Sequence, residues 1–203
     1  HGCEIPQNKT CKNQIPNGAE IVFYYAGHGV QFGIENYLLP IDVAAQNVQT
    51  VTDYSMGLPQ ILQSLGEKNL KFTLAVVDAC RDNPFRAMGN QHATRGVKVT
   101  KEQEQVISAR GIVPTNTAAV GQMVIYSASA GQQALDNLGP ADPDPNGLFT
   151  RVFLRQMREP GVTIDRIVRQ VKKEVVRLAK SVNHDQVPAL YDQTVGEFYF
   201  TQE

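Results

Sequence analysis

The stretch IVFYYAGHGV, residues 21–30, decides the fold class. Its β-branched and aromatic residues end in Ala-Gly-His-Gly, so we expect His28 to stand between two glycines where the chain leaves a buried strand. Two similar runs follow, FTLAVVDA at 72–79 and MVIYSA at 123–128. All three are almost continuously apolar rather than alternating, which is typical of a parallel sheet covered on both faces.

Helical patterns separate and follow these runs. LPQILQSL (58–65) lies between the first two, and GLFTRVFLRQM (147–157) follows the third. A longer amphipathic stretch covers 163–180, and its apolar stripe consists of Ile164, Ile167, Val168, Val171, Val175 and Leu178. EFYF (197–200) reads as a final edge strand. The order of elements predicts an α/β domain without internal repeats.

Composition bounds the function classes. The chain has 203 residues, 42% of them hydrophobic, which suits one domain with a sizeable core. Its 19 basic and 20 acidic residues give a net charge of -1, so we expect neither a nucleic-acid nor a membrane partner. No apolar run reaches the roughly 20 residues of a membrane span, and no signal-peptide order is visible. We therefore expect a cytoplasmic location, although the chain begins at His1, which leaves room for a preceding leader.

Cysteine usage points to one reactive thiol. Cys3, Cys11 and Cys80 are too few and too scattered for a disulfide framework, and no further Cys/His cluster suggests zinc. We expect no metal and no cofactor. Cys3 and Cys11 lie in a polar leader, whereas Cys80 ends an apolar strand.

His28 and Cys80 are the candidate chemical pair. In a parallel α/β sheet the ligand crevice lies beyond the carboxyl ends of the strands, and both residues fall there. If their strands are neighbours, the two ends lie ~5 Å apart. A cysteine nucleophile needs a histidine that manages its proton. Gly27 and Gly29 would then allow close approach of a substrate and an N–H for an oxyanion. Taken singly, His28 is as easily a turn residue and Cys80 a core residue.

The domain divides around an irregular segment. Residues 86–122 are rich in Gly, Gln, Thr and charge, and connections of this length are usually functional or disordered. We interpret them as a linker between a larger part, 19–85, and a smaller part, 123–203. Residues 1–18 form a polar leader or the remnant of a missing N-terminal part.

YYAGHG, followed by DACR with Cys80 52 positions after His28, resembles the caspase-like cysteine peptidases, especially their bacterial, metacaspase-related members. The resemblance implies the caspase-like fold, with His28 as general acid–base and Cys80 as nucleophile. It also implies an oxyanion hole formed by the N–H groups of Gly29 and Cys80. It extends, in order, through ENYLLPID (35–42), DACRDNPF (78–85), VIYSASAGQQALD (124–136), NGLFTRVFL (146–154) and QVPALYDQTVGEFYF (186–200).

Specificity follows from departures from the animal pattern. Animal caspases hold an acidic P1 side chain with an arginine and a glutamine, and the matching positions here are Asp136 and Asp78. Two carboxylates would repel Asp and attract Lys or Arg. Ser127 and Ala134 are further substrate-binding positions by the same resemblance. Alternatively, both aspartates have only structural roles: Asp136 caps a turn and Asp78 ends a strand. Asp82 replaces the Gly of the short signature.

A protease of this specificity could cut itself. The linker contains four basic residues, Arg95, Lys98, Lys101 and Arg110, as candidate autoprocessing sites. The family sheet also begins before EIVFYY, yet the nineteen residues upstream show no strand–helix–strand pattern. We therefore expect the first strand or strands, and one more acidic pocket residue, to come from a preceding segment or another domain.

The sequence allows three other interpretations. DPDPNG (142–147) matches the start of a calcium loop, but its twelfth position is Phe153 rather than Glu, so a turn with Asn146 as helix N-cap fits better. Calcium activation at other acidic sites stays open. A nucleotide-binding domain lacks support, because AGHGVQFG has neither the G-x-G-x-x-G spacing nor a Walker lysine. The main alternative is a catalytically inactive, caspase-like interaction module.

Overall fold

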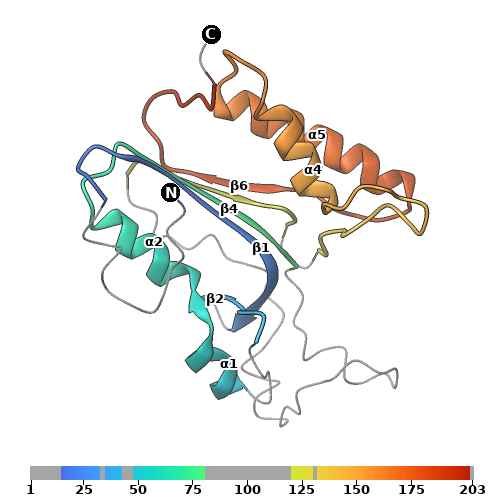
Figure 1. Ribbon diagram of the computed structural model, residues 1–203, viewed down its shortest axis with the longest axis horizontal. Coiled ribbons are helices and arrows are strands. Elements are labelled where there is room, and N and C mark those ends of the chain that lie inside the picture. The colour runs from blue at the N-terminus through green and yellow to red at the C-terminus, as the bar shows by residue number, and fades with distance from the viewer. Residues whose placement is uncertain (1–14, 33–34, 43–47, 81–119, 130–131, 202–203) are drawn as a thin grey trace.

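The computed structural model describes residues 15–32, 35–42, 48–80, 120–129 and 132–201 (Figure 1). These residues form a six-stranded mixed sheet in the order β3-β2-β1-β4-β5-β6. The central strands β1, β4 and β5 are parallel, and the strands outside them are antiparallel to their neighbours. The strands are β1 Glu20–Phe32, β2 Glu35–Leu38, β3 Met56–Gly57, β4 Phe72–Cys80, β5 Gln122–Tyr126 and β6 Ala189–Asp192.

Helices cover both faces of this sheet. α1 (Val48–Tyr54) and α2 (Leu58–Gly66) lie on one side, and α4 (Leu148–Gln156) and α5 (Ile164–Ser181) lie on the other (Figure 1). The helices predicted at 58–65, 147–157 and 163–180 are therefore confirmed to within two residues. In the part of the chain that is described, no helix is long and apolar enough to cross a membrane.

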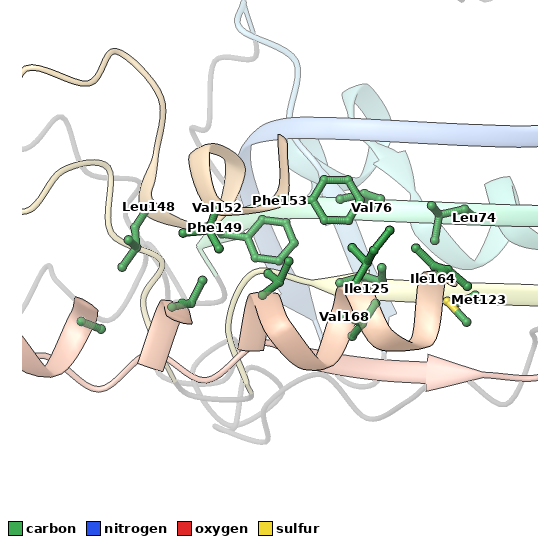
Figure 2. Close-up of a cluster of buried hydrophobic side chains, with 14 of the residues drawn as sticks. Leu74, Val76, Met123, Ile125, Leu148, Phe149, Val152, Phe153, Ile164 and Val168 are labelled. Carbon is green, nitrogen blue, oxygen red and sulfur yellow. The ribbon is translucent and has the colours of Figure 1, made fainter. Parts of the chain in front are cut away.

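Two cores follow from the alternation of side chains along the strands. Even-numbered residues of β4, such as Leu74 and Val76, pack with α4 and α5 in the larger core, where Phe149 and Phe153 stack (Figure 2). Odd-numbered residues, such as Ala75, pack toward α2 in the smaller core. Because β4 is buried on both faces, its run of apolar residues is continuous, as predicted.

β1 departs from the prediction in two ways. It does not end before His28 but continues to Phe32, because Val30 and its neighbours gain an antiparallel partner in β2. It is also only half buried, with Val22 50% and Tyr24 44% exposed. Among the described residues, β2 pairs with β1 only from Gly29 onward. The part of β1 before Gly29 therefore has a partner strand on the β4 side only. An apolar run therefore did not mean full burial here.

The C-terminal prediction was also wrong in detail. EFYF makes only an isolated bridge, Thr163 to Tyr199, while its phenylalanines pack onto the larger core. The edge strand is the preceding β6, whose four residues pair antiparallel with β5. At the start of α4, the N-cap is Gly147 rather than Asn146, and no side chain of its own caps it.

Candidate active site

The carboxyl ends of β1 and β4 bring positions 28 and 80 together. These strands are parallel neighbours, and their register pairs His28 with Cys80, Gly27 with Ala79 and Ala26 with Asp78. The neighbouring strands assumed from the sequence are therefore present. His28 is exposed at the point where β1 changes partner from β4 to β2, and Gly29 follows it opposite Leu38. An imidazole here lies at a strand junction rather than in a free turn.

Tyr25 holds the backbone at His28. Its hydroxyl oxygen lies 2.6 Å from the carbonyl oxygen of His28 and 2.8 Å from that of Leu39. The same His28 carbonyl accepts the N–H of Leu39 at 2.9 Å. Burial raises the pKa of the Tyr25 hydroxyl. Two donors, the Tyr25 hydroxyl of the same strand and the Leu39 N–H, thus hold the backbone carbonyl of His28.

Gly27 has a local structural reason. A Cβ at this position would lie 2.7 Å from the hydroxyl oxygen of Tyr25 and 3.0 Å from its ring carbon Cζ. The phenol crosses over Gly27 to reach the His28 carbonyl, so a side chain there would displace it. Gly27 therefore leaves room for the Tyr25 phenol, and its role in admitting a substrate stays a prediction.

The carboxylate of Asp78 is held by α4. The hydroxyl of Thr150 donates to Oδ2 of Asp78 at 2.5 Å, and the hydroxyl of Tyr24 lies 2.5 Å from the same Thr150 oxygen. Thr150 is the third residue of α4, where backbone N–H groups lack helical acceptors, and its own N–H also bonds to Asp78. Asp78 therefore caps α4 from the neighbouring strand.

Despite these bonds, the site disfavours the charge on Asp78. Burial raises the pKa of its carboxyl, and this outweighs the lowering by the hydrogen bonds of Thr150. The Ser127 hydroxyl also lowers the pKa from beside the carboxylate, although its geometry falls short of a full hydrogen bond. Of the charged side chains that are described, Asp136 is the one acting on Asp78, and it raises the pKa further.

Gly147 lies close to both Asp78 and Asp136. An added Cβ on Gly147 would be 3.6 Å from Oδ2 of Asp78 and 4.0 Å from the Cα of Asp136. The backbone of Gly147, at φ -54° and ψ 155°, is open to any residue, and N-caps favour Ser, Asp or Asn. The backbone of Gly147 therefore lies close to both carboxyl-bearing residues. Asp136 itself is exposed.

The buried side-chain amide of Gln186 links two segments next to Asp78 and Asp136. The side chain of Gln186 donates to the carbonyl of Ser127 at 2.9 Å and accepts the N–H of Leu135 at 3.0 Å. It thus ties the end of β5 to the segment that carries Ala134 and Asp136. Ser127 is fully buried, and Ala134 is half buried. Both predicted substrate-binding positions therefore flank Asp78 and Asp136.

The residues that build this site were only partly predicted. Tyr24, Tyr25, Thr150 and Gln186 were missed. Thr150 stood in the quoted motif NGLFTRVFL, and Tyr25 in YYAGHG, but a hydroxyl within an apolar run signals no partner by itself. Asp82 and the four basic linker residues lie outside the described residues.

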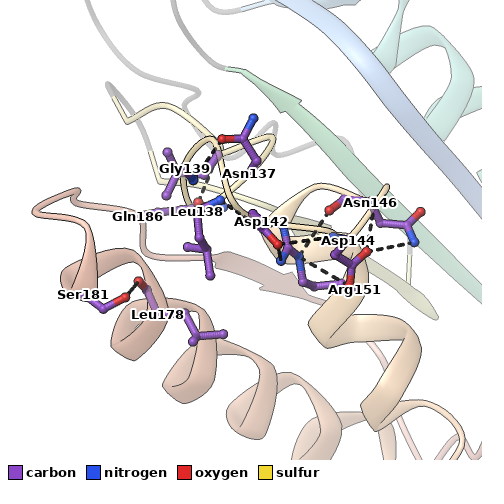
Figure 3. A network of polar contacts seen from close by, with 11 residues as sticks. Asn137, Leu138, Gly139, Asp142, Asp144, Asn146, Arg151, Leu178, Ser181 and Gln186 are labelled. Carbon is purple, nitrogen blue, oxygen red and sulfur yellow. Dashed lines mark hydrogen bonds and ion pairs between the residues drawn. The ribbon is translucent and has the colours of Figure 1, made fainter.

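The calcium-like loop carries its own cation. Arg151 donates to Oδ1 and Oδ2 of Asp142 at 2.9 and 2.7 Å, and its Nε bonds to the carbonyl of Asn146 at 3.2 Å (Figure 3). Asp144 lies 3.9 Å from the same guanidinium. The guanidinium of Arg151 thus lies beside both Asp142 and Asp144, and the expectation that calcium does not bind this loop stays a prediction. Among the described residues, no group of three His, Cys, Asp or Glu side chains could hold a metal.

The fold and the sequence together identify the protein family of this chain. The described residues form a mixed sheet with a parallel centre, in which His28 and Cys80 are the last paired residues of β1 and β4. The model of the caspase domain matches residues 11–199, and the chain belongs to this family. The domain family is one of cysteine peptidases, so the resemblance stated from the sequence is confirmed.

Two known proteins are similar to this chain at low sequence identity. A probable protease of a Desulfuromonadales bacterium is 25% identical over 194 residues, which cover 87% of this chain and 21% of that protein. The chain thus spans about a fifth of that relative's length. The crystal structure of caspase-1 from Spodoptera frugiperda aligns with a TM-score of 0.45 at 14% identity, covering 89% of this chain and 63% of the caspase.

Proposed function

We propose that this chain is a cysteine endopeptidase that hydrolyses peptide bonds after Arg or Lys through His28 and Cys80. Family membership supports the peptidase class, and a peptide or protein is then the substrate. The registered pair of strand ends supports the dyad, because it sets the two backbones one strand spacing apart.

The proposed reaction has two steps. The Cys80 thiolate attacks the scissile carbonyl carbon, and the peptide N–H groups of Gly29 and Cys80 bind the oxyanion. The C–N bond then breaks, and the His28 imidazolium gives its proton to the leaving amine. Next, His28 takes a proton from water, which attacks the thioester. The C–S bond breaks, which releases a carboxylic acid that loses its proton to solvent, and restores the Cys80 thiolate and the His28 imidazolium.

The observation that carries the specificity is the uncompensated carboxylate of Asp78. A buried carboxylate that lies beside a second carboxylate costs stability, and perturbed groups of this kind cluster at functional sites. A guanidinium or ammonium at P1 would supply the opposite charge, and an arginine could pair with a carboxylate through two hydrogen bonds.

The dyad is tested by hydrolysis of arginyl and lysyl peptides with wild type, Cys80→Ala and His28→Ala. Each variant should lose activity by about 10³-fold or more while unfolding at the wild-type temperature. A thiol-directed peptide electrophile should label wild type but not Cys80→Ala. Folded variants with near-normal activity would contradict the dyad, and an unlabelled, inactive wild type would favour the inactive interaction module.

The same specificity leads us to propose self-processing between 86 and 122. Intact mass after incubation of active protein should show two associated fragments, the first ending at Arg95, Lys98, Lys101 or Arg110. Cleavage should be absent in Cys80→Ala. A wild type that hydrolyses peptides and stays a single chain would contradict this proposal.

A further inference from the structure

We infer that Thr150 is a positioning residue for recognition of a basic P1 side chain, because its hydroxyl sets the orientation of the Asp78 carboxylate. The inference rests on the proposed function and goes beyond it. Thr150 belongs to α4 in the smaller part of the domain, whereas Asp78 ends β4 in the larger part. Their hydrogen bond therefore joins the two parts at the proposed pocket.

The direction of the hydrogen bonds is determined. A threonine hydroxyl carries one proton, and Thr150 gives it to Oδ2 of Asp78. The Tyr24 hydroxyl, 2.5 Å from Thr150 Oγ1, must then donate to that oxygen. The chain Tyr24 to Thr150 to Asp78 runs in one direction, so each bond polarises the next. The last acceptor is the carboxylate, whose negative charge this arrangement favours.

Position and burial make this chain stiff. Thr150 is 9% exposed, and its backbone is the third residue of a helix that packs into the larger core through Phe149. The Thr150 hydroxyl holds Oδ2 in place, so the carboxylate plane cannot turn freely. A bidentate guanidinium requires a fixed carboxylate plane, whereas a lysine ammonium tolerates a range of orientations. The hydroxyl should therefore matter more for arginyl than for lysyl substrates.

The matched variants are Thr150→Val, which removes the hydroxyl at nearly constant shape, and Thr150→Ser, which keeps it. We measure kcat and KM for peptides that differ only in P1: Arg, Lys and a neutral residue. Thr150→Val should lower kcat/KM on the arginyl peptide about tenfold, mostly through KM, and change the lysyl value less. The neutral peptide should be unaffected. Thr150→Ser should stay within about threefold of wild type.

Tyr24→Phe removes the donor to Thr150 and keeps the ring, so it should show a smaller loss of the same kind. It also keeps the test decisive if Thr150→Val fails to fold. Equal losses on all three peptides, or none on the arginyl peptide, would overturn the inference. A wild type that does not cleave after Arg or Lys would instead contradict the proposed function itself.

Discussion

Two pairs of acidic residues in this domain have opposite environments. Asp142 and Asp144 surround the guanidinium of Arg151, and the bidentate bonds from Arg151 hold the pKa of Asp142 well below its usual range. Asp78 and Asp136 lie close together with no described cation between them, and the pKa of Asp78 is raised. The first pair is complete within the chain, whereas the second lacks a counter-ion that a substrate could provide.

The contributions of Asp142 and Asp78 to the stability of the fold should therefore change with pH in opposite directions. Asp142 has a lowered pKa in the folded state, so its stabilisation is present above the unfolded value of about 3.9 and is lost as pH falls further. Asp78 has a raised pKa, so the folded state holds its proton longer. Stability then falls as pH rises from about 3.9 through the folded value.

The largest effect is expected for Asp136→Ala, which removes one charge from the open pair. A bound arginyl peptide would cover both carboxylates, so the loss of one partner of its P1 cation should lower kcat/KM on arginyl peptides by about 10- to 1000-fold. The midpoint of thermal unfolding should hardly change, because Asp136 is exposed. Steady-state kinetics and calorimetry check both. Unchanged arginyl kinetics would show that the second carboxylate plays no part in binding.

Asp142→Ala breaks the closed pair and should act mainly on stability. It leaves Arg151, whose side chain is 14% exposed, without its bidentate partner, and it removes the acceptor of the Leu138 N–H. The midpoint of thermal unfolding should fall by several degrees at pH 7. The ratio of arginyl to lysyl cleavage should be unchanged. An unaltered midpoint would mean that this ion pair contributes nothing to the fold.

Asp78→Asn removes the negative charge of the Asp78 side chain but keeps a hydrogen-bond acceptor for Thr150. The variant should unfold at the same temperature as wild type or one to a few degrees higher at pH 7, because the buried charge is gone while an acceptor for Thr150 remains. The difference should shrink toward pH 3, where wild-type Asp78 is protonated. Tyr24, Asp136 and Ser127 face this group and are unchanged in both proteins. A stability gap that widens on acidification would contradict the raised pKa.

The smallest effect is expected for Arg151→Lys. The ammonium keeps the positive charge beside Asp142 but cannot reproduce both bidentate bonds and the bond to the Asn146 carbonyl. The midpoint of thermal unfolding should fall by less than for Asp142→Ala, with peptide cleavage preserved. A loss as large as that of Asp142→Ala would assign the effect to geometry rather than charge.

The sequence predicted the centre of the fold better than its edges. β4 and β5 lie between layers of helices, so their apolar runs are continuous and easy to recognise. β2, β3 and β6 have four residues or fewer, which is too short for a periodic pattern to appear. β1 looked like a buried strand, yet its first part has a half-exposed face, which depends on neighbours rather than on its own composition.

The candidate site divides in a similar way. His28 and Cys80 could be placed together because strand ends follow from the order of elements, and the resemblance pointed to Asp78 and Asp136. The contacts that orient Asp78 could not be predicted, because Tyr24 and Thr150 are 126 positions apart in the chain. Only the packing of α4 against the sheet brings their hydroxyls together.

The central claim is that Asp78 and Asp136 bind a basic P1 side chain. The P1 profile of the wild-type protein tests this claim most directly. A peptide library randomised at P1 is incubated with the protein, and the products are identified by mass spectrometry. The account predicts cleavage after Arg and Lys and almost none after Asp or Glu, since two carboxylates repel an acidic P1 side chain. Efficient cleavage after Asp with none after Arg would contradict it.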